Sequence, residues 1–308
     1  MVNKLSRSEN CNVGYSKLVH KEEGNIMGQR HKYEYKVNPN HAATKVTRMT
    51  GKGKRVLELG SGPGSITRLL KDNQCRVTAL ELDDKAIEIV SAYCEKVYPC
   101  DLNDPDWPQK LADSDRFEVI VAGDVLEHLY DPWATLDRLK PLLTNDGCVV
   151  ISLPHVGHNA VIACLLNSDL EYQPWGLLDK THIRFFGIKN IQKLLNDAGF
   201  KIVDADFVVK MPEQTEFAGQ WRKLPEQTRQ ALASGKFGTI YQVVVKAVPD
   251  SAPGKSLLLE SLPVSKPTKE SFSTGAKGNR ILGFLLSFIS LKTRKKIARL
   301  LERIGIRV

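Results

Sequence analysis

A short apolar segment, a cluster of glycines and an amphipathic segment follow one another over residues 55–72. Residues 55–59 (Arg-Val-Leu-Glu-Leu) are apolar enough for a buried parallel strand. Residues 65–71 place their apolar side chains on one face of a helix. Three glycines separate the two segments at alternate positions: Gly60, Gly62 and Gly64. Because glycine permits sharp turns and close approach to the main chain, the sequence predicts a strand–turn–helix unit that can receive a ligand.

The glycine spacing separates this turn from a dinucleotide-binding turn. The dinucleotide pattern is G-x-G-x-x-G, whereas here the third glycine comes one residue earlier. A second apolar strand ends at Glu81, which lies 21 positions after Gly60. Near this offset, a carboxylate reaches both hydroxyls of a ribose bound over the first turn. Glu81 is therefore the ribose candidate, and the alternative is a tight turn that binds nothing.

The glycine set with the preceding Glu58 resembles motif I of the class I S-adenosylmethionine (SAM)-dependent methyltransferases. This resemblance implies SAM as the cofactor, and it places Asp101, after the third strand, near the adenine amino group. The alternative role of Asp101 is the N-cap of a helix. The residues expected to bind SAM are Glu58, Gly60, Ser61, Gly62, Gly64, Glu81, Leu82, Asp101, Leu102 and Asp124.

Strands and helices alternate from residue 55 onward, as in a doubly wound sheet. The family implies that the last two strands pair antiparallel. The predicted fold is therefore α/β and Rossmann-like, with a seven-stranded, mostly parallel sheet and an antiparallel last strand. The expected strands are 55–59, 76–81, 96–100, 117–122, 147–153, 201–209 and 239–248. The expected helices are 42–49, 64–72, 84–93, 106–113, 133–143, capped by Gly147, and 226–233.

The fourth expected strand runs into Asp-Val-Leu-Glu-His-Leu-Tyr-Asp-Pro at 124–132, which resembles a signature of the same family. The resemblance places His128 near the transferred methyl group. Histidine, with an ordinary pKa of about 6.5, can take a hydroxyl proton at neutral pH. Glu127 is the weaker base candidate, since an ordinary glutamate has a pKa of about 4.3. The alternative is that His128 only shapes the pocket.

Motifs after the fifth strand resemble a bacterial subgroup of methyltransferases associated with surface polysaccharide and other glycan assembly. These motifs are residues 155–158 (His-Val-Gly-His), residues 179–186 (Asp-Lys-Thr-His-Ile-Arg-Phe-Phe) and residues 194–200, although His155 stands where the subgroup has Asn. The resemblance implies O-methylation of a hydroxyl on a sugar or glycan intermediate. The substrate candidates are Tyr172, Trp175, Asp179, His182 and Arg184. An internal tie between Asp179 and Arg184 is the favoured alternative to substrate binding by these two residues.

Two other functions remain open at this point. Some small-molecule and quinone-type O-methyltransferases share the Glu-His pair, and a non-catalytic SAM-binding scaffold would keep the glycine turn. We expect no metal ion, because the six cysteines form no C-x-x-C and no histidine accompanies them at zinc spacing. These cysteines are typical of reduced thiols in a cytoplasmic protein.

The net charge of +9 lies almost entirely in the last part of the chain. Residues 250–308 contain 12 Lys and Arg against 4 Asp and Glu, whereas residues 1–249 contain 32 against 31. We therefore expect a small-molecule or glycan partner and no nucleic acid. The expected organisation is an irregular arm over 1–30, a methyltransferase domain over 31–248, a linker over 249–278 and a basic amphipathic helix over 279–308.

The segment 279–308 combines an apolar stripe with eight basic residues and one acidic residue. This pattern is typical of a helix that lies on an anionic membrane surface, here the inner face of the membrane. A terminal helix docked on the domain or in a homodimer fits the same pattern equally well. The sequence leaves the oligomeric state open.

Overall fold

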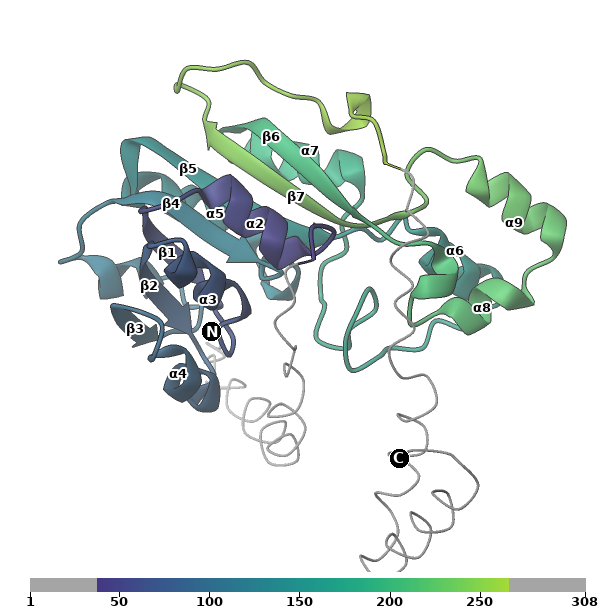
Figure 1. Ribbon diagram of the computed structural model, residues 1–308, viewed down its shortest axis with the longest axis horizontal. Coiled ribbons are helices and arrows are strands. Elements are labelled where there is room, and N and C mark those ends of the chain that lie inside the picture. The colour runs from purple at the N-terminus through teal and green to yellow at the C-terminus, as the bar shows by residue number, and fades with distance from the viewer. Residues whose placement is uncertain (1–37, 266–308) are drawn as a thin grey trace, which may run out of the picture. The chain divides into compact units, whose positions relative to one another are not determined.

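The computed structural model of the protein describes residues 38–265 and contains one seven-stranded sheet (Figure 1). The neighbouring strands, in spatial order, are β3 (Lys96–Pro99), β2 (Arg76–Glu81), β1 (Arg55–Leu59), β4 (Phe117–Gly123), β5 (Leu143–Pro154), β7 (Ile240–Pro249) and β6 (Phe200–Val209). Strand β7 is antiparallel to β5 and β6, whereas the pairings among the other strands are parallel. The predicted fold class is therefore confirmed.

The strand order places a topological switch point between β1 and β4. The chain first builds outward from β1 to β2 and β3, and then returns to β4 on the other side of β1. Ligands of open α/β sheets bind beyond the carboxyl ends of the strands at such a point. The glycine loop after β1 and the segment after β4 therefore lie at the same edge of the sheet.

Helices cover both faces of the sheet because the strands are apolar on both sides. On one face, α2 (Ala42–Thr50) and α3 (Ser65–Asp72) contribute Val46, Met49 and Leu70 to the core. On the other face, α5 (Pro132–Leu139) and α7 (Ile188–Asp197) contribute Leu136, Leu139, Ile191 and Leu194. The remaining helical segments are α4 (Asp84–Val90), α6 (Asn159–Leu166), α8 (Ala218–Lys223), α9 (Glu226–Ala233) and the short 3-10 segments η3 (Trp107–Leu111), η4 (Leu126–His128), η5 (Lys140–Leu142), η6 (Pro212–Gln214) and η7 (Leu259–Ser261).

Three helices, α6, α8 and α9, form a separate group beside the end of the sheet (Figure 1). Helices α6 and α8 share a small apolar core of Ala163, Trp221 and Leu224. The long segment between α6 and α7 contains residues 167–187, and it carries the substrate candidates. This group and this segment form the part of the fold that lies beyond the carboxyl ends of the strands.

Two local predictions are wrong. Gly147 does not cap a helix, because the chain leaves η5 at Leu142 and β5 already begins at Leu143. The pairing of β4 with β5 shifts register after Phe117, and Gly147 lies in this irregular stretch. The helix expected over 106–113 is the 3-10 segment η3, which contains Pro108 near its start and is too short for regular α-helical hydrogen bonding.

Packed structure continues beyond residue 248, into the segment predicted as a linker. The amide of Leu257 donates to the carbonyl oxygen of Ile202 on β6 at 2.8 Å, and the side chain of Leu259 is buried in the core. The rest of the predicted linker, the predicted helix over 279–308 and the predicted arm over 1–30 lie outside the described residues. Across residues 38–265, no helix is both long enough and apolar enough to cross a membrane.

Candidate active site

The glycine loop after β1 has the backbone conformation that its sequence predicts. Gly60, Gly62 and Gly64 all have positive φ angles, of 56°, 53° and 88°. A Cβ atom on Gly60 would lie 2.9 Å from Cγ2 of Val125, so the loop packs directly against the segment after β4. A Cβ atom on Gly62 would meet no atom within 4 Å. The loop is therefore anchored at Gly60 and open at Gly62.

The carboxylate of Glu81 lies against this loop and accepts three backbone hydrogen bonds. Oε2 accepts from the amide of Gly62 at 2.6 Å, and Oε1 accepts from the amides of Leu82 and Asp83 at 2.9 Å each. The side chain of Leu82 is 61% exposed beside it. Glu81 thus links the end of β2 to the glycine loop, 19 residues earlier in the chain.

Glu58 occupies a different position, below the loop. Its side chain is buried, and Oε2 accepts a hydrogen bond from the hydroxyl of Thr67 on α3 at 2.7 Å. Burial raises the pKa of Glu58 to about 8, so its carboxyl group is mainly protonated at neutral pH. Oε2 of Glu58 therefore links β1 to α3 through the hydroxyl of Thr67. Ser61, the loop residue between Gly60 and Gly62, is also buried.

The residues after β3 include two residues expected to bind SAM, Asp101 and Leu102. Asp101 is exposed, and its Oδ1 accepts from the amide of Asn103 at 2.8 Å, so it closes a local turn instead of capping a helix. The side chain of Leu102 packs in the core, so this residue can reach a ligand only through its backbone. Asp101 and the exposed Leu82 flank the position of Glu81.

Asp124 connects the ends of three strands. It follows β4 with a positive φ of 55°, and its carboxylate accepts from Ser152 Oγ on β5 at 2.8 Å and from Gln242 Nε2 on β7 at 2.7 Å. Burial raises the pKa of Asp124. The sequence indicated Asp124 but neither of its partners, because both lie in apolar strands whose pairing the sequence does not specify.

Glu127, in η4, is fully buried, and neither carboxylate oxygen has a hydrogen-bond partner within residues 38–265. Burial raises the pKa of Glu127 well above its ordinary value, and the nearby carboxylates of Asp124 and Asp179 raise it further. The sequence ranked Glu127 as a weak base on the assumption of an ordinary pKa. That assumption is wrong, because the side chain points inward from the 3-10 turn.

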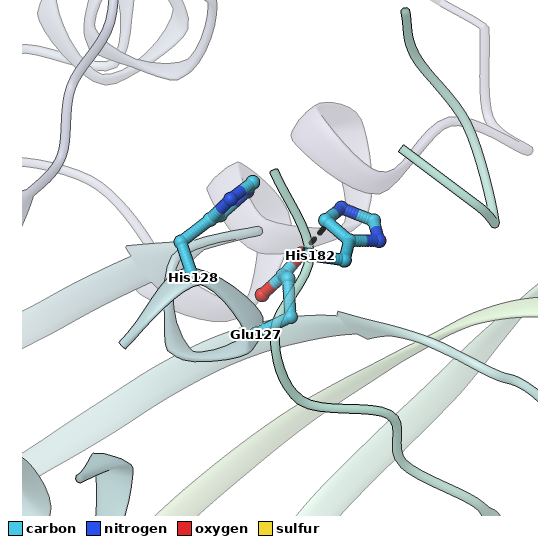
Figure 2. Close-up of side chains that lie close together, drawn as sticks. All are labelled: Glu127, His128 and His182. Carbon is cyan, nitrogen blue, oxygen red and sulfur yellow. Dashed lines mark ion pairs between the residues drawn. The ribbon is translucent and has the colours of Figure 1, made fainter. Parts of the chain in front are cut away.

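Glu127, His128 and His182 form a cluster that the sequence did not reveal (Figure 2). Nε2 of His182 lies 3.9 Å from Oε1 of Glu127, and the ring centroids of His128 and His182 are 4.8 Å apart. The carbonyl oxygen of Glu127 accepts from the amides of Ile183 and Arg184 at 3.0 Å each, which brings the segment containing His182 beside η4.

The two histidines of the cluster have different surroundings. Burial lowers the pKa of His182 to about 4, so this ring is neutral at neutral pH. Nδ1 of His128 lies 3.1 Å from the carbonyl oxygen of Thr181. Because a carbonyl can only accept, Nδ1 carries a hydrogen, and Nε2 is the ring nitrogen that remains for a ligand or an acceptor hydroxyl.

The predicted tie between Asp179 and Arg184 is wrong. Oδ1 of Asp179 accepts from the amide and the hydroxyl of Thr181, at 2.8 and 2.7 Å. The guanidinium group of Arg184 donates to the carbonyl oxygen of Tyr130. Asp179 and Arg184 therefore each bind another partner: Asp179 binds the nearby Thr181, and Arg184 binds a main-chain oxygen. Of the other three substrate candidates, His182 belongs to the cluster with Glu127, and Tyr172 and Trp175 are both 51% exposed on the same segment.

The histidines after β5 have structural roles. Nδ1 of His158 accepts from the amide of Ala160 at 3.1 Å, where it caps α6, and Nε2 lies 2.9 Å from the carbonyl oxygen of Lys210. The backbone of His155 pairs with Phe186 in an isolated bridge. Burial lowers the pKa of both histidines to about 4.

Lys210, beyond the end of β6, is a residue near the site that sequence reasoning missed. Its ammonium group lies 3.4 Å from the ring centroid of Tyr241, and burial lowers its pKa. The only signal was a single lysine after the apolar run of β6.

Comparison with known proteins agrees with this geometry. Residues 30–205 match the family model described as a methyltransferase domain, which covers more than half of the chain. The chain belongs to this methyltransferase family. A ubiquinone biosynthesis O-methyltransferase of Coxiella burnetii is 22% identical over 188 residues, which are 59% of this chain and 78% of that protein.

One solved structure of low sequence identity shows the same fold. The structure named a putative methyltransferase from Bacillus halodurans has 17% sequence identity and a TM-score of 0.50, and the match covers 68% of this chain and 99% of that chain. The structure of 1,6-didemethyltoxoflavin-N1-methyltransferase from Burkholderia thailandensis, with bound S-adenosylhomocysteine, has 18% identity and a TM-score of 0.43, and covers 68% and 78%.

The cofactor of this methyltransferase is SAM. The loop fits it, because the open face beside Gly62 and the carboxylate of Glu81 lie together at the switch point. The residues that would hold SAM are Gly60, Gly62 and Gly64 along the main chain, with Glu81 at the ribose and Asp101 at the adenine. When bound, SAM supplies an activated methyl group on a sulfonium.

Proposed function

We propose that this enzyme methylates a hydroxyl oxygen on an acceptor that carries a large apolar part, as a quinone precursor does. The observation that carries the proposal is the position of the Glu127, His128 and His182 cluster beside exposed apolar side chains. In the reaction, the bond from sulfur to the methyl carbon breaks as the bond from the acceptor oxygen forms. The hydroxyl proton must leave, and we infer that it leaves at this cluster.

The cluster is suited to a hydroxyl acceptor because it lies next to the cofactor loop. Val125, which contacts Gly60, is three residues before His128. His128 is the partly exposed member of the cluster, whereas Glu127 is fully buried. An acceptor that approaches from the open side therefore meets His128 first. Positioning the acceptor oxygen and removing its proton are the main contributions the protein can make to methyl transfer.

Exposed apolar side chains surround this position. Tyr130 is 69% exposed, Ile183 is 42% exposed and Phe185 is 41% exposed. They are neighbours, because Arg184 binds the carbonyl oxygen of Tyr130 and the ring of Phe185 lies 6.5 Å from that of His182. An exposed apolar patch at the edge of a site is typical of one that binds an apolar ligand. The names of the ubiquinone biosynthesis O-methyltransferases among the relatives indicate a ligand of this kind.

The sugar or glycan acceptor implied by the later motifs is less well supported. Sugar binding needs several polar side chains with free donors or acceptors. Asp179 binds Thr181, Arg184 binds Tyr130, and both ring nitrogens of His158 contact backbone atoms. These motif residues are used internally, so the apolar acceptor is the better proposal.

A direct test measures transfer from labelled SAM to paired acceptors. One acceptor is a catechol that carries a polyprenyl chain, the second is the same catechol without the chain, and the third is a nucleotide sugar. We expect the first to be methylated with a KM at least about tenfold below that of the second, since each buried methylene contributes about 0.8 kcal/mol and two of them already give this factor. Turnover of the nucleotide sugar alone would contradict the proposal.

A pair of variants tests the apolar patch. Phe185→Ser should raise KM for the chain-bearing catechol several-fold and leave KM for the short catechol unchanged. Leu258→Ser is the matched control, because Leu258 is 62% exposed and lies on the segment after β7 instead of beside His128. An equal effect of both variants would mean that the patch does not bind the acceptor.

A further inference from the structure

We propose that Glu127, His128 and His182 bind a divalent transition-metal ion of the Zn²⁺ type, with one coordination position left for the acceptor oxygen. This inference rests on the proposed function and assigns to its site a metal that the sequence analysis did not expect. Two imidazoles and one carboxylate are a donor set that Zn²⁺ uses in catalytic sites with an open fourth position.

The first argument is the carboxylate of Glu127. It is completely buried, and neither oxygen has a hydrogen-bond partner among the described residues. A buried polar group without a partner costs free energy, and a bound ion is one of the few things that removes this cost.

The second argument is geometric. One ligand atom from each of the three side chains can be chosen so that all lie within 4.8 Å of one another. Tetrahedral zinc, with bonds of about 2.0–2.1 Å, places its ligand atoms about 3.3 Å apart. The 3.9 Å between Oε1 of Glu127 and Nε2 of His182 is near this value, and the proposal requires that the side chains move closer together when the ion binds.

The third argument is the support behind each ligand. The carbonyl oxygen of Thr181 accepts from Nδ1 of His128, which leaves Nε2 as the ligand atom and fixes the ring, as outer partners do in known metal sites. The carbonyl oxygen of Glu127 accepts hydrogen bonds from the amides of Ile183 and Arg184, so the backbone next to His182 is fixed to the backbone of Glu127. These bonds keep His128 and His182 close together, although the two residues are 54 positions apart in the sequence.

A metal ion here has a clear chemical use. An acceptor hydroxyl that contacts the ion has a lowered pKa, so it loses its proton to water more readily and becomes a better nucleophile. His128 is then a ligand of the ion instead of the proton acceptor itself. The methyl group moves from sulfur to oxygen as before, and no oxidant or reductant takes part.

The test uses the full chain and Co²⁺ as a spectroscopic probe for a Zn²⁺ site. After dialysis against a chelator, we expect one Co²⁺ per chain, with visible absorption bands that Zn²⁺ abolishes. Glu127→Gln and His182→Ala should each weaken Co²⁺ binding by more than about tenfold, since even residues behind a ligand affect affinity by about 10–100-fold. His155→Asn is the matched control, because His155 is buried outside the cluster and should leave Co²⁺ binding unchanged.

Retained SAM binding in each variant shows that the chain still folds. Failure of the unchanged protein to bind Co²⁺ or Zn²⁺, or equal binding by Glu127→Gln and the unchanged protein, would overturn the metal site. Because this assay needs no acceptor, its failure is separate from failure of the proposed O-methylation, which the acceptor assay measures.

Discussion

Replacing Glu81 by glutamine changes one atom of the side chain and should affect both the fold and the cofactor site. The carboxylate of Glu81 accepts from Gly62 through Oε2 and from Leu82 and Asp83 through Oε1. The glutamine side chain has only one oxygen. Either the amide of Gly62 or the amides of Leu82 and Asp83 must therefore face an NH₂ group, which cannot accept. If the oxygen stays with Leu82 and Asp83, the amide of Gly62 loses its acceptor.

The size of both effects follows from these contacts. A hydrogen bond to a charged group contributes about 1.5–3 kcal/mol, so Glu81→Gln should lower the free energy of unfolding by about this amount. For a protein of this size, about 2–4 °C of Tm accompanies each kcal/mol, which gives a fall of about 3–12 °C. Loss of a bond of this kind from the ribose hydroxyls should weaken SAM binding by about 13–160-fold.

Calorimetric melting and SAM titration measure these two quantities on the same samples. Asp197→Asn is the control, because Asp197 pairs with Lys193 at 2.7 Å on the exposed side of α7 and is remote in sequence from the glycine loop. Such a pair contributes at most about 1 kcal/mol, and SAM affinity should not change. If Glu81→Gln binds SAM as tightly as the unchanged protein, the placement of the ribose over Glu81 is wrong.

Three further changes have specific expected outcomes. His128→Ala should lower turnover of the true acceptor by about 10²–10⁴-fold and leave SAM affinity nearly intact, and full turnover by the variant would show that His128 only shapes the pocket. Because burial raises the pKa of Glu58 from 4.5 to about 8, the folded chain holds an extra proton between these values, and stability contributed by this group falls as pH rises through that window. Glu58→Gln should therefore flatten the decline in urea-unfolding free energy, whereas an unchanged pH profile would mean that Glu58 stays charged. From the sequence alone we expect the full chain to sediment with anionic liposomes at low salt, and a chain ending at Pro249 to stay in solution and still bind SAM. Because Leu257 and Leu259 pack on the domain, the shortened chain for this test ends at Ser265 instead. If neither chain sediments, the segment after 265 does not bind membranes.

Local signals in the sequence were sufficient for the frame of the fold. The bounds of β1, β2 and α9 agree with the predicted ranges, because each of these segments has a clear apolar pattern or clear end signals. Gly147 misled the prediction, since glycine after a helical pattern usually indicates a C-cap. Here the pairing of β5 with β4 starts earlier, at Leu143, and this tertiary contact overrides the local signal.

The candidate site also contains residues that the sequence could predict and residues that it could not. The glycine loop and Glu81 are predictable because their spacing is fixed by one strand–turn–helix unit and the next strand. The approach of His182 to Glu127 is not, because it depends on a backbone contact between segments more than 50 residues apart. Asp179 was expected to pair with Arg184, but a hydroxyl two residues away provided a nearer partner in Thr181.

The most direct test of the account is the position of the methyl group in the product. SAM with a ¹³C-labelled methyl group, incubated with the enzyme and the chain-bearing catechol, should yield a product whose label is bonded to oxygen, as seen by NMR of the purified compound. His128→Ala should form this product far more slowly under the same conditions. Label on nitrogen or carbon, or no transfer to any hydroxyl acceptor by an enzyme that binds SAM, would contradict the proposed O-methylation.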